Sequence, residues 1–116
     1  MILLALGSCD KEVRYDYYVI NQCPTNIEIT VVTNPYKPNT TIFNVERNQK
    51  ELIYQGYGIN KLQKEILEHF FVNIIIKNDE NISSISYVNA DLWKFEPTSE
   101  SHANCYLTIN PEDFEQ

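Results

Sequence analysis

Glycine, proline and basic residues are all scarce in this chain. Its 116 residues include 3 glycines and 5 prolines and show no internal repeat, which excludes collagen-like and low-complexity proteins. Lysine and arginine together number 9, against 16 aspartates and glutamates, so the formal net charge is -7. An acidic surface repels phosphate backbones, and the sequence therefore argues against a nucleic-acid-binding protein. The length and a hydrophobic content of 43% suit one domain with a single core.

Residue patterns that carry catalysis or bind metals are also missing. The serines form no nucleophile elbow, and Ser99, Ser101 and His102 share a polar stretch that suits a solvated turn. His69 and His102 lie too far apart in sequence to suggest a zinc site. The 78–81 stretch offers oxygen ligands without the spacing of an EF-hand, and its residues are those of a tight turn. We therefore expect no catalytic residues, no metal site, no cofactor and no enzyme activity.

No apolar run reaches the ~18 residues that a membrane-spanning helix requires. A short segment near the start, Leu6-Gly7-Ser8-Cys9, offers another route to a membrane. Apolar residues precede it, and the charged residues Asp10-Lys11-Glu12 follow at once. The arrangement resembles the lipobox of bacterial lipoproteins, in which two small residues admit the signal peptidase and the cysteine accepts a diacylglyceryl group. This resemblance implies that Cys9 becomes a lipid-bearing N-terminus.

The lipobox divides the chain into three expected parts. Residues 1–8 are a signal-peptide remnant that is removed, residues 9–13 a lipid anchor and tether, and residues 14–116 a single domain. A secretory signal has a positive region and ~7–15 apolar residues, whereas no Lys or Arg precedes Cys9. We therefore expect the printed sequence to start inside a longer signal. The alternative is an ordinary apolar N-terminal strand that buries the cysteine.

Two cysteines remain once Cys9 is assigned to the lipid. Cys23 and Cys105 form an even pair in an exported protein, where disulfides persist. Their positions share parity with apolar residues of the two terminal strands, so both side chains are expected to point into the core. A bridge would close a loop of about 80 residues and contribute roughly 4–5 kcal/mol. The alternative is two free buried thiols that pack as small apolar side chains.

Segments of β-branched, aromatic and alternating apolar residues fill the rest of the chain, and turn-forming residues separate them. The predicted strands are 14–21, 27–31, 40–46, 51–55, 70–77, 83–88, 92–95 and 105–109. About seven short strands at close spacing predict an all-β fold, an antiparallel immunoglobulin-like sandwich. A short helix over 61–69, capped by Asn60, is the alternative to irregular structure in the middle of the chain.

Four finer predictions concern how these segments connect. We expect 40–46 and 51–55 to form a hairpin, and the glycines of 56–58 to end the second of these strands. Apolar residues on both faces of 70–77 indicate a central strand that is covered on both sides. The polar composition of 97–104 indicates a loop.

The ending Trp93-Lys94-Phe95, Ala103 to Ile109 and Asp113-Phe114, together with the lipobox and the acidic domain, resembles small lipoproteins of Bacteroidota. That resemblance implies an immunoglobulin-like sandwich anchored at the outer membrane. Acidic residues straight after the cysteine resemble a surface-export signal of that group, whereas an aspartate there marks inner-membrane retention in enteric bacteria. The periplasmic face and the cell surface both stay open.

Aromatic residues are the remaining lead to a binding site. Tyr36 lies between two prolines and Tyr57 between two glycines, so both are candidate binding residues on loops. Tyr17, Tyr54 and Trp93 are expected in the core. The resulting hypothesis is a lipid-anchored binding or scaffolding module whose partner is an envelope protein or a glycan. The alternatives are a structural subunit of fimbrial or surface-layer type and an enzyme with an unrecognised site.

Overall fold

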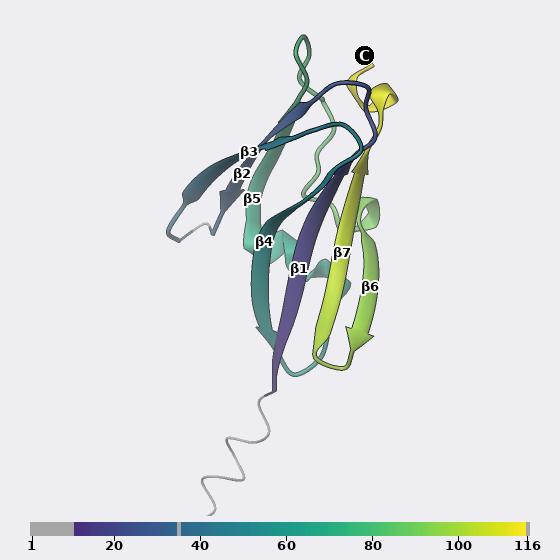
Figure 1. The fold of residues 1–116 in the computed structure, drawn as a ribbon. Coiled ribbons are helices and arrows are strands. Elements are labelled where there is room, and N and C mark those ends of the chain that lie inside the picture. The colour runs from purple at the N-terminus through teal and green to yellow at the C-terminus, as the bar shows by residue number, and fades with distance from the viewer. Residues whose placement is uncertain (1–10, 35, 116) are drawn as a thin grey trace, which may run out of the picture.

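The computed structural model describes residues 11–34 and 36–115. In this part of the chain seven strands form two sheets, which confirms the predicted all-β sandwich (Figure 1). The four-stranded sheet has the order β4-β1-β7-β6 and the three-stranded sheet the order β3-β2-β5. The strands are β1 (Glu12–Asn21), β2 (Ile27–Thr33), β3 (Asn39–Val45), β4 (Lys50–Ile59), β5 (Phe71–Lys77), β6 (Lys94–Ser99) and β7 (His102–Ile109).

The helical segments are short. In place of the expected helix over 61–69, the structure has a 3-10 turn, η1 (Lys64–Ile66), and one turn of α-helix, α2 (Leu67–Phe70). Two further 3-10 turns follow, η2 (Ala90–Leu92) and η3 (Pro111–Phe114). Asn60 has a φ of 76°, a left-handed conformation that an N-cap does not adopt, so the helix begins later than expected. The last of these turns, η3, begins with a capping box between Asn110 and Asp113, in which the Asn110 N–H donates to the Asp113 carboxylate at 2.8 Å.

β1 occupies the middle of the four-stranded sheet. It pairs antiparallel with β4 and parallel with β7, so the sheets are mainly but not wholly antiparallel. In an immunoglobulin constant domain the first strand shares its sheet with the second, fourth and fifth strands. Here the first strand instead joins the fourth, sixth and seventh.

The core lies between the two sheets and is rich in aromatic rings. Tyr17 of β1 is 1% exposed and meets the rings of Phe71 and Trp93 edge-on, with centroid distances of 5.2 and 5.5 Å. Such edge-to-face pairs each contribute roughly 0.5–1.5 kcal/mol beyond burial. Tyr17 and Trp93 are therefore core residues as expected, and Tyr54 packs against Tyr17 and Phe71 from a partly buried position.

The predicted hairpin between 40–46 and 51–55 is wrong. β3 pairs with β2 and β4 pairs with β1, so the chain changes sheets between Val45 and Lys50. Hydrogen bonds from this connection to Asn21 give the reason: the Asn48 N–H donates to the Asn21 carbonyl, and the Asn21 N–H donates to Gln49. The buried Asn21 amide also donates to the Val45 carbonyl. The end of β1 therefore directs β4 along its own edge.

The prediction of a covered central strand over 70–77 is also wrong. β5 is an edge strand, and only Phe71, Ile74 and Ile76 of its residues are buried. The prediction was wrong because β5 carries apolar residues, Val72 and Ile75, on positions that are exposed, so the sequence suggested that both faces of the strand were buried.

Three other segment predictions need correction. Residues 83–88 form no strand, and the isolated bridge to Lys77 is made by Ile82, just before them. Within the segment, Ser83 and Tyr87 hydrogen-bond to each other, with 2.7 Å between their hydroxyls. The 56–58 stretch continues β4, where a Cβ at Gly56 would collide with the ring of Phe70. The 97–104 stretch contributes to β6 and β7, with only Glu100 and Ser101 between them.

Two buried tyrosines on β1 predict opposite effects of the same substitution. The Tyr15 hydroxyl accepts a hydrogen bond of 2.8 Å from the Gln63 N–H, whereas the buried Tyr17 hydroxyl has no partner in the part of the chain that the structure describes. We expect Tyr15→Phe to lower the free energy of unfolding by about 1 kcal/mol. Tyr17→Phe is expected to leave it unchanged or raise it, because the unpaired hydroxyl is removed. Urea denaturation of both variants measures the difference, and an equal loss for the two would contradict the assignment.

Candidate functional site

The side of the four-stranded sheet that faces away from the core, termed the outer face, brings polar and aromatic side chains together. Even-numbered residues of β1 and β7 share this face and lie opposite one another because the two strands run parallel in register. The four rows are Arg14 with His102, Asp16 with Asn104, Tyr18 with Tyr106, and Ile20 with Thr108. Residues of the first and last strands of the chain therefore build one surface.

Asp16 is the most buried residue of the outer face, with an exposed fraction of 5%. Its carboxylate accepts hydrogen bonds from Gln55 Nε2 at 3.0 Å and His102 Nε2 at 2.8 Å, and Arg14 Nη2 lies 3.3 Å away. A carboxylate removed from water is tolerated only where donors replace the lost hydration. Three donors from β4, β1 and β7 supply this replacement, so Asp16 fixes three neighbouring strands in place.

The network continues from His102 to Thr98. The hydroxyl of Thr98 lies 2.5 Å from Nδ1 of His102, which gives a hydroxyl, imidazole and carboxylate in sequence. Hydrolases use this order of groups, with the imidazole accepting the proton of the hydroxyl. Because Nε2–H donates to Asp16, Nδ1 of the neutral ring is an acceptor, and the Thr98 hydroxyl donates to it rather than to the His102 carbonyl 3.3 Å away. Both ring nitrogens of His102 are then hydrogen-bonded, so Thr98 and Asp16 together hold the imidazole in one orientation.

The aromatic half of the outer face lies further along β1. Tyr18 and Tyr106 stack with 5.5 Å between ring centroids and 20° between ring planes. The Lys50 ammonium lies 4.9 Å from the Tyr18 centroid and 5.6 Å from that of Tyr106. A cation over aromatic rings contributes about 0.5–1 kcal/mol at an exposed site. This arrangement holds a positive charge beside two flat apolar surfaces.

A hollow of about 420 Å³ lies next to this aromatic pair. Its lining residues come from all four strands of the sheet: Ile20, Lys50, Lys94, Glu96, Tyr106 and Thr108. Lys94 and Glu96 pair at 3.3 Å along its β6 side. Two ammonium groups, one carboxylate, the Thr108 hydroxyl and the phenol ring of Tyr106 thus border the same hollow.

The two tyrosines that the sequence suggested as binding residues lie on different surfaces. Tyr57 lies opposite Arg14 on the outer face, at the end of β4 rather than in a loop, and is 53% exposed. Tyr36 is 96% exposed and borders a separate hollow of about 330 Å³ with Tyr54, His69 and others. The structure therefore brings neither of them to the 420 Å³ hollow.

Sequence reasoning missed Tyr18, Tyr106 and the buried Asp16. Their signal was the alternation along the two terminal strands, since each has the opposite parity to the inward-facing Tyr17 and Cys105. What the sequence did not contain was the parallel register of β1 with β7, which sets them side by side.

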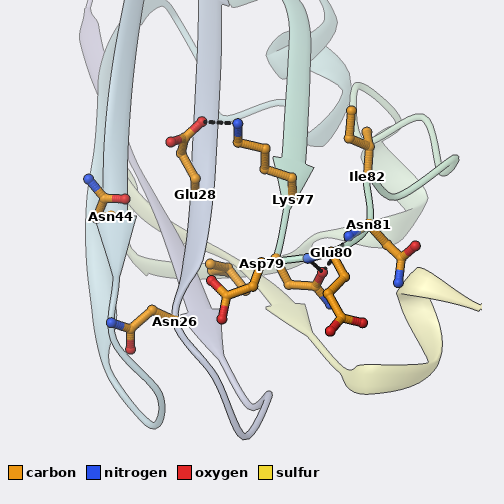
Figure 2. Close-up of a pocket in the computed structure, with 10 residues that line it drawn as sticks. Asn26, Glu28, Asn44, Lys77, Asp79, Glu80, Asn81 and Ile82 are labelled. Atoms are coloured by element: carbon orange, nitrogen blue, oxygen red, sulfur yellow. Dashed lines mark hydrogen bonds and ion pairs between the residues drawn. The ribbon is translucent and has the colours of Figure 1, made fainter.

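A third hollow, about 340 Å³ in volume, is lined mainly by amides and carboxylates (Figure 2). Glu28 and Lys77 pair across it at 3.2 Å. The Asn78 side chain accepts hydrogen bonds from the backbone N–H groups of Glu80 and Asn81 at 3.0 and 2.7 Å, so 78–81 is a turn as expected. No three potential ligands among His, Cys, Asp and Glu cluster around a possible metal position in the described residues.

The predicted bridge between Cys23 and Cys105 is not formed, and both residues are buried free thiols. Cys105 lies beside Tyr17, whereas Cys23 follows the end of β1 and its Sγ donates to the Ile109 carbonyl at 3.7 Å. Four residues along a strand span ~13 Å, and a disulfide needs Cα atoms within about 7 Å. Burial raises the pKa of Cys105 to about 12 and also raises that of Cys23, so both thiols stay protonated and unreactive near neutral pH.

Comparison with known proteins leaves the site to be interpreted from its own chemistry. No family model matches this chain, and no curated protein or solved structure matches it. Within residues 11–34 and 36–115, no helix is long and apolar enough to cross a membrane. Cys9 and the rest of the lipobox lie outside the described residues.

Proposed function

We propose that this protein is a lipid-anchored binding module of the bacterial envelope and that the 420 Å³ hollow on its outer face binds a glycan. The observation that carries the proposal is the stacked pair of Tyr18 and Tyr106 with Lys50 above it, at the edge of that hollow. Sugar rings present apolar C–H faces and hydroxyl edges. A flat aromatic ring surrounded by hydrogen-bonding groups is suited to both features.

The charges around the hollow favour an acidic sugar. Lys50 and Lys94 contribute two positive charges and Glu96 one negative charge, within a chain of net charge -7. A carboxylate on the ligand would pair with Lys50 and would not compete with Asp16 for its donors, because Asp16 is bound by three other side chains, Arg14, Gln55 and His102. The ligand class we propose is therefore an oligosaccharide that contains uronic acid.

Rigidity below the hollow supports binding over catalysis. The Asp16 network joins β4, β1 and β7 directly beside the tyrosine row. A surface held in place before the ligand arrives loses little conformational freedom on binding. A flat, fixed platform of this kind is what a recognition module requires.

The lipobox supports the anchoring part of the proposal. If Cys9 carries the lipid, the start of β1 at Glu12 lies next to the membrane, together with the turn between β6 and β7 (Figure 1). Tyr18 lies six residues further along β1, which corresponds to ~20 Å. The hollow then opens sideways above the bilayer. Either face of an outer membrane is compatible with this orientation.

The ligand is tested by isothermal titration of the full chain in detergent against uronic-acid oligosaccharides and their neutral counterparts. We expect the acidic compounds to bind, and Tyr106→Ala to weaken binding roughly 2- to 12-fold, because an aromatic contact contributes about 0.5–1.5 kcal/mol. Tyr106→Phe keeps the ring and should retain most of the affinity. Lys50→Met should remove the preference for acidic sugars.

The matched control for these variants is Tyr57→Ala, which removes an exposed tyrosine from the other end of the same face. It is expected to leave the affinity unchanged. Absence of binding by every acidic oligosaccharide, or an equal loss for Tyr57→Ala and Tyr106→Ala, would reject the glycan site.

The anchor is tested separately by replacing the lipobox cysteine. We expect Cys9→Ser to move the protein from the membrane pellet to the soluble fraction, because a hydroxyl cannot accept the thioether-linked lipid. Cys23→Ala is the control and should stay in the pellet, since the Cys23 thiol is buried in the core. Mass spectrometry of the wild type should show the added acyl chains, and membrane retention of Cys9→Ser would disprove the anchor.

A further inference from the structure

The two sheets have four edge strands, and three of these are protected against pairing with another chain. β4 and β6 carry charged residues, and β6 also carries Pro97. Each of β4, β5 and β6 has a register shift that leaves one of its residues without a partner: Ile53, Val72 and Thr98, respectively. The free edge of β5 is further covered, because Ile82 bridges to Lys77 and the Ser83 N–H donates to Ile76. Charges, prolines, bulges and coverage are the devices that prevent edge-to-edge association.

β3 has none of these devices. Its residues, Asn39–Val45, include no charged residue and no proline. It pairs with β2 at seven consecutive positions without a register shift, so the strand is regular along its whole length. Its first four residues are exposed, and Ile42 at its centre is 58% exposed. Among the described residues, no strand pairs with the side of β3 that faces away from β2, so its backbone groups can pair with an added strand.

Figure 1 shows β3 on the side of its sheet away from β5, with the four-stranded sheet elsewhere in the fold. A strand added there would continue the three-stranded sheet without reaching the outer-face hollow, which the other sheet carries. The edge of β3 is thus a surface independent of the proposed glycan site.

We propose that β3 pairs antiparallel with β3 of a second copy of this chain, which joins two three-stranded sheets into one of six strands. A two-fold axis at Ile42, the middle residue of β3, sets each strand against itself, as a symmetric dimer requires. Thr40 then lies opposite Asn44, and Thr41 opposite Phe43. The seam of this dimer, defined as Asn39–Val45 of both copies, contains no charged residue. Two chains of net charge -7 therefore meet where neither contributes a repelling side chain.

Apolar contact across the seam adds to the backbone hydrogen bonds. Ile42 and Ile75 lie on the same face of the sheet, because both are partners of Thr30. They are 58% and 37% exposed, respectively. Pairing at the axis places Ile42 against Ile42 of the second copy and extends this exposed apolar row across the dimer. Two copies would also present two outer-face hollows from one membrane, which strengthens binding to a repetitive polymer.

The contact is tested in intact cells with single cysteine substitutions. Directly opposite residues of an antiparallel pair have Cα atoms about 4.5–5.5 Å apart, within the range of a disulfide. We expect full-length Ile42→Cys to form a disulfide-linked dimer on a non-reducing gel. Ile59→Cys, a control that changes the same residue type at a position 62% exposed on the other sheet, should stay monomeric. Failure of Ile42→Cys to form the linked dimer, a linked dimer for Ile59→Cys as well, or linkage of Ile42→Cys to a different protein would overturn the proposal.

A charge at the seam provides a second, independent test. Native mass spectrometry of the detergent-solubilised chain should give the mass of a dimer for the wild type and of a monomer for Ile42→Lys, because two ammonium groups would then face each other. Ile75→Lys adds the same charge on the same face, away from the seam, and should remain a dimer with unchanged circular dichroism. A monomeric wild type, or a dimeric Ile42→Lys, would disprove pairing through β3. Glycan affinity per chain is unaffected in either case, so the two proposals can fail separately.

Discussion

The parallel pairing of β1 with β7 is the constraint on which both the core and the candidate site depend. It places Arg14 beside His102 and Tyr18 beside Tyr106, residues from opposite ends of the sequence. On the inner side the same register sets Tyr17 against Cys105, within the aromatic core. On the outer side it aligns the Asp16 network and the stacked tyrosines. One register therefore determines what is buried and what is presented to solvent.

The fold separates surfaces of different chemistry. The outer face of the four-stranded sheet combines a buried carboxylate, aromatic rings and ammonium groups, which suits recognition of a polar ligand. The edge of the three-stranded sheet is uncharged and regular, which suits strand pairing. Because different sheets carry the two surfaces, ligand binding and self-association need not compete. In the anchored dimer that we propose, this division leaves both hollows open to a polymer.

Local patterns in the sequence determined much of the fold but not its long-range pairing. Alternation in 14–21 and 27–31 predicted two strands correctly, and the residues of 78–81 predicted a turn. The hairpin predicted around Asn48 was wrong because this connection hydrogen-bonds to Asn21, which is distant in sequence. The prediction of a disulfide between Cys23 and Cys105 was wrong for a related reason. Alternation along a strand shows which face a side chain lies on, but not which residue of the neighbouring strand lies opposite it. Tyr18 and Tyr106 became a candidate site only once the strand register was known.

Hydrogen exchange of the backbone amides, resolved by residue, tests the central position of β1 most directly. β1 is hydrogen-bonded on both sides and its inward side chains are buried, so its amides should exchange only when the whole domain unfolds. The amides of Ser84 and Ser86, which are exposed and belong to no strand, should exchange orders of magnitude faster. If the amides of β1 exchanged as fast as those of Ser84 and Ser86, β1 would not be the strand that holds the two ends of the chain together.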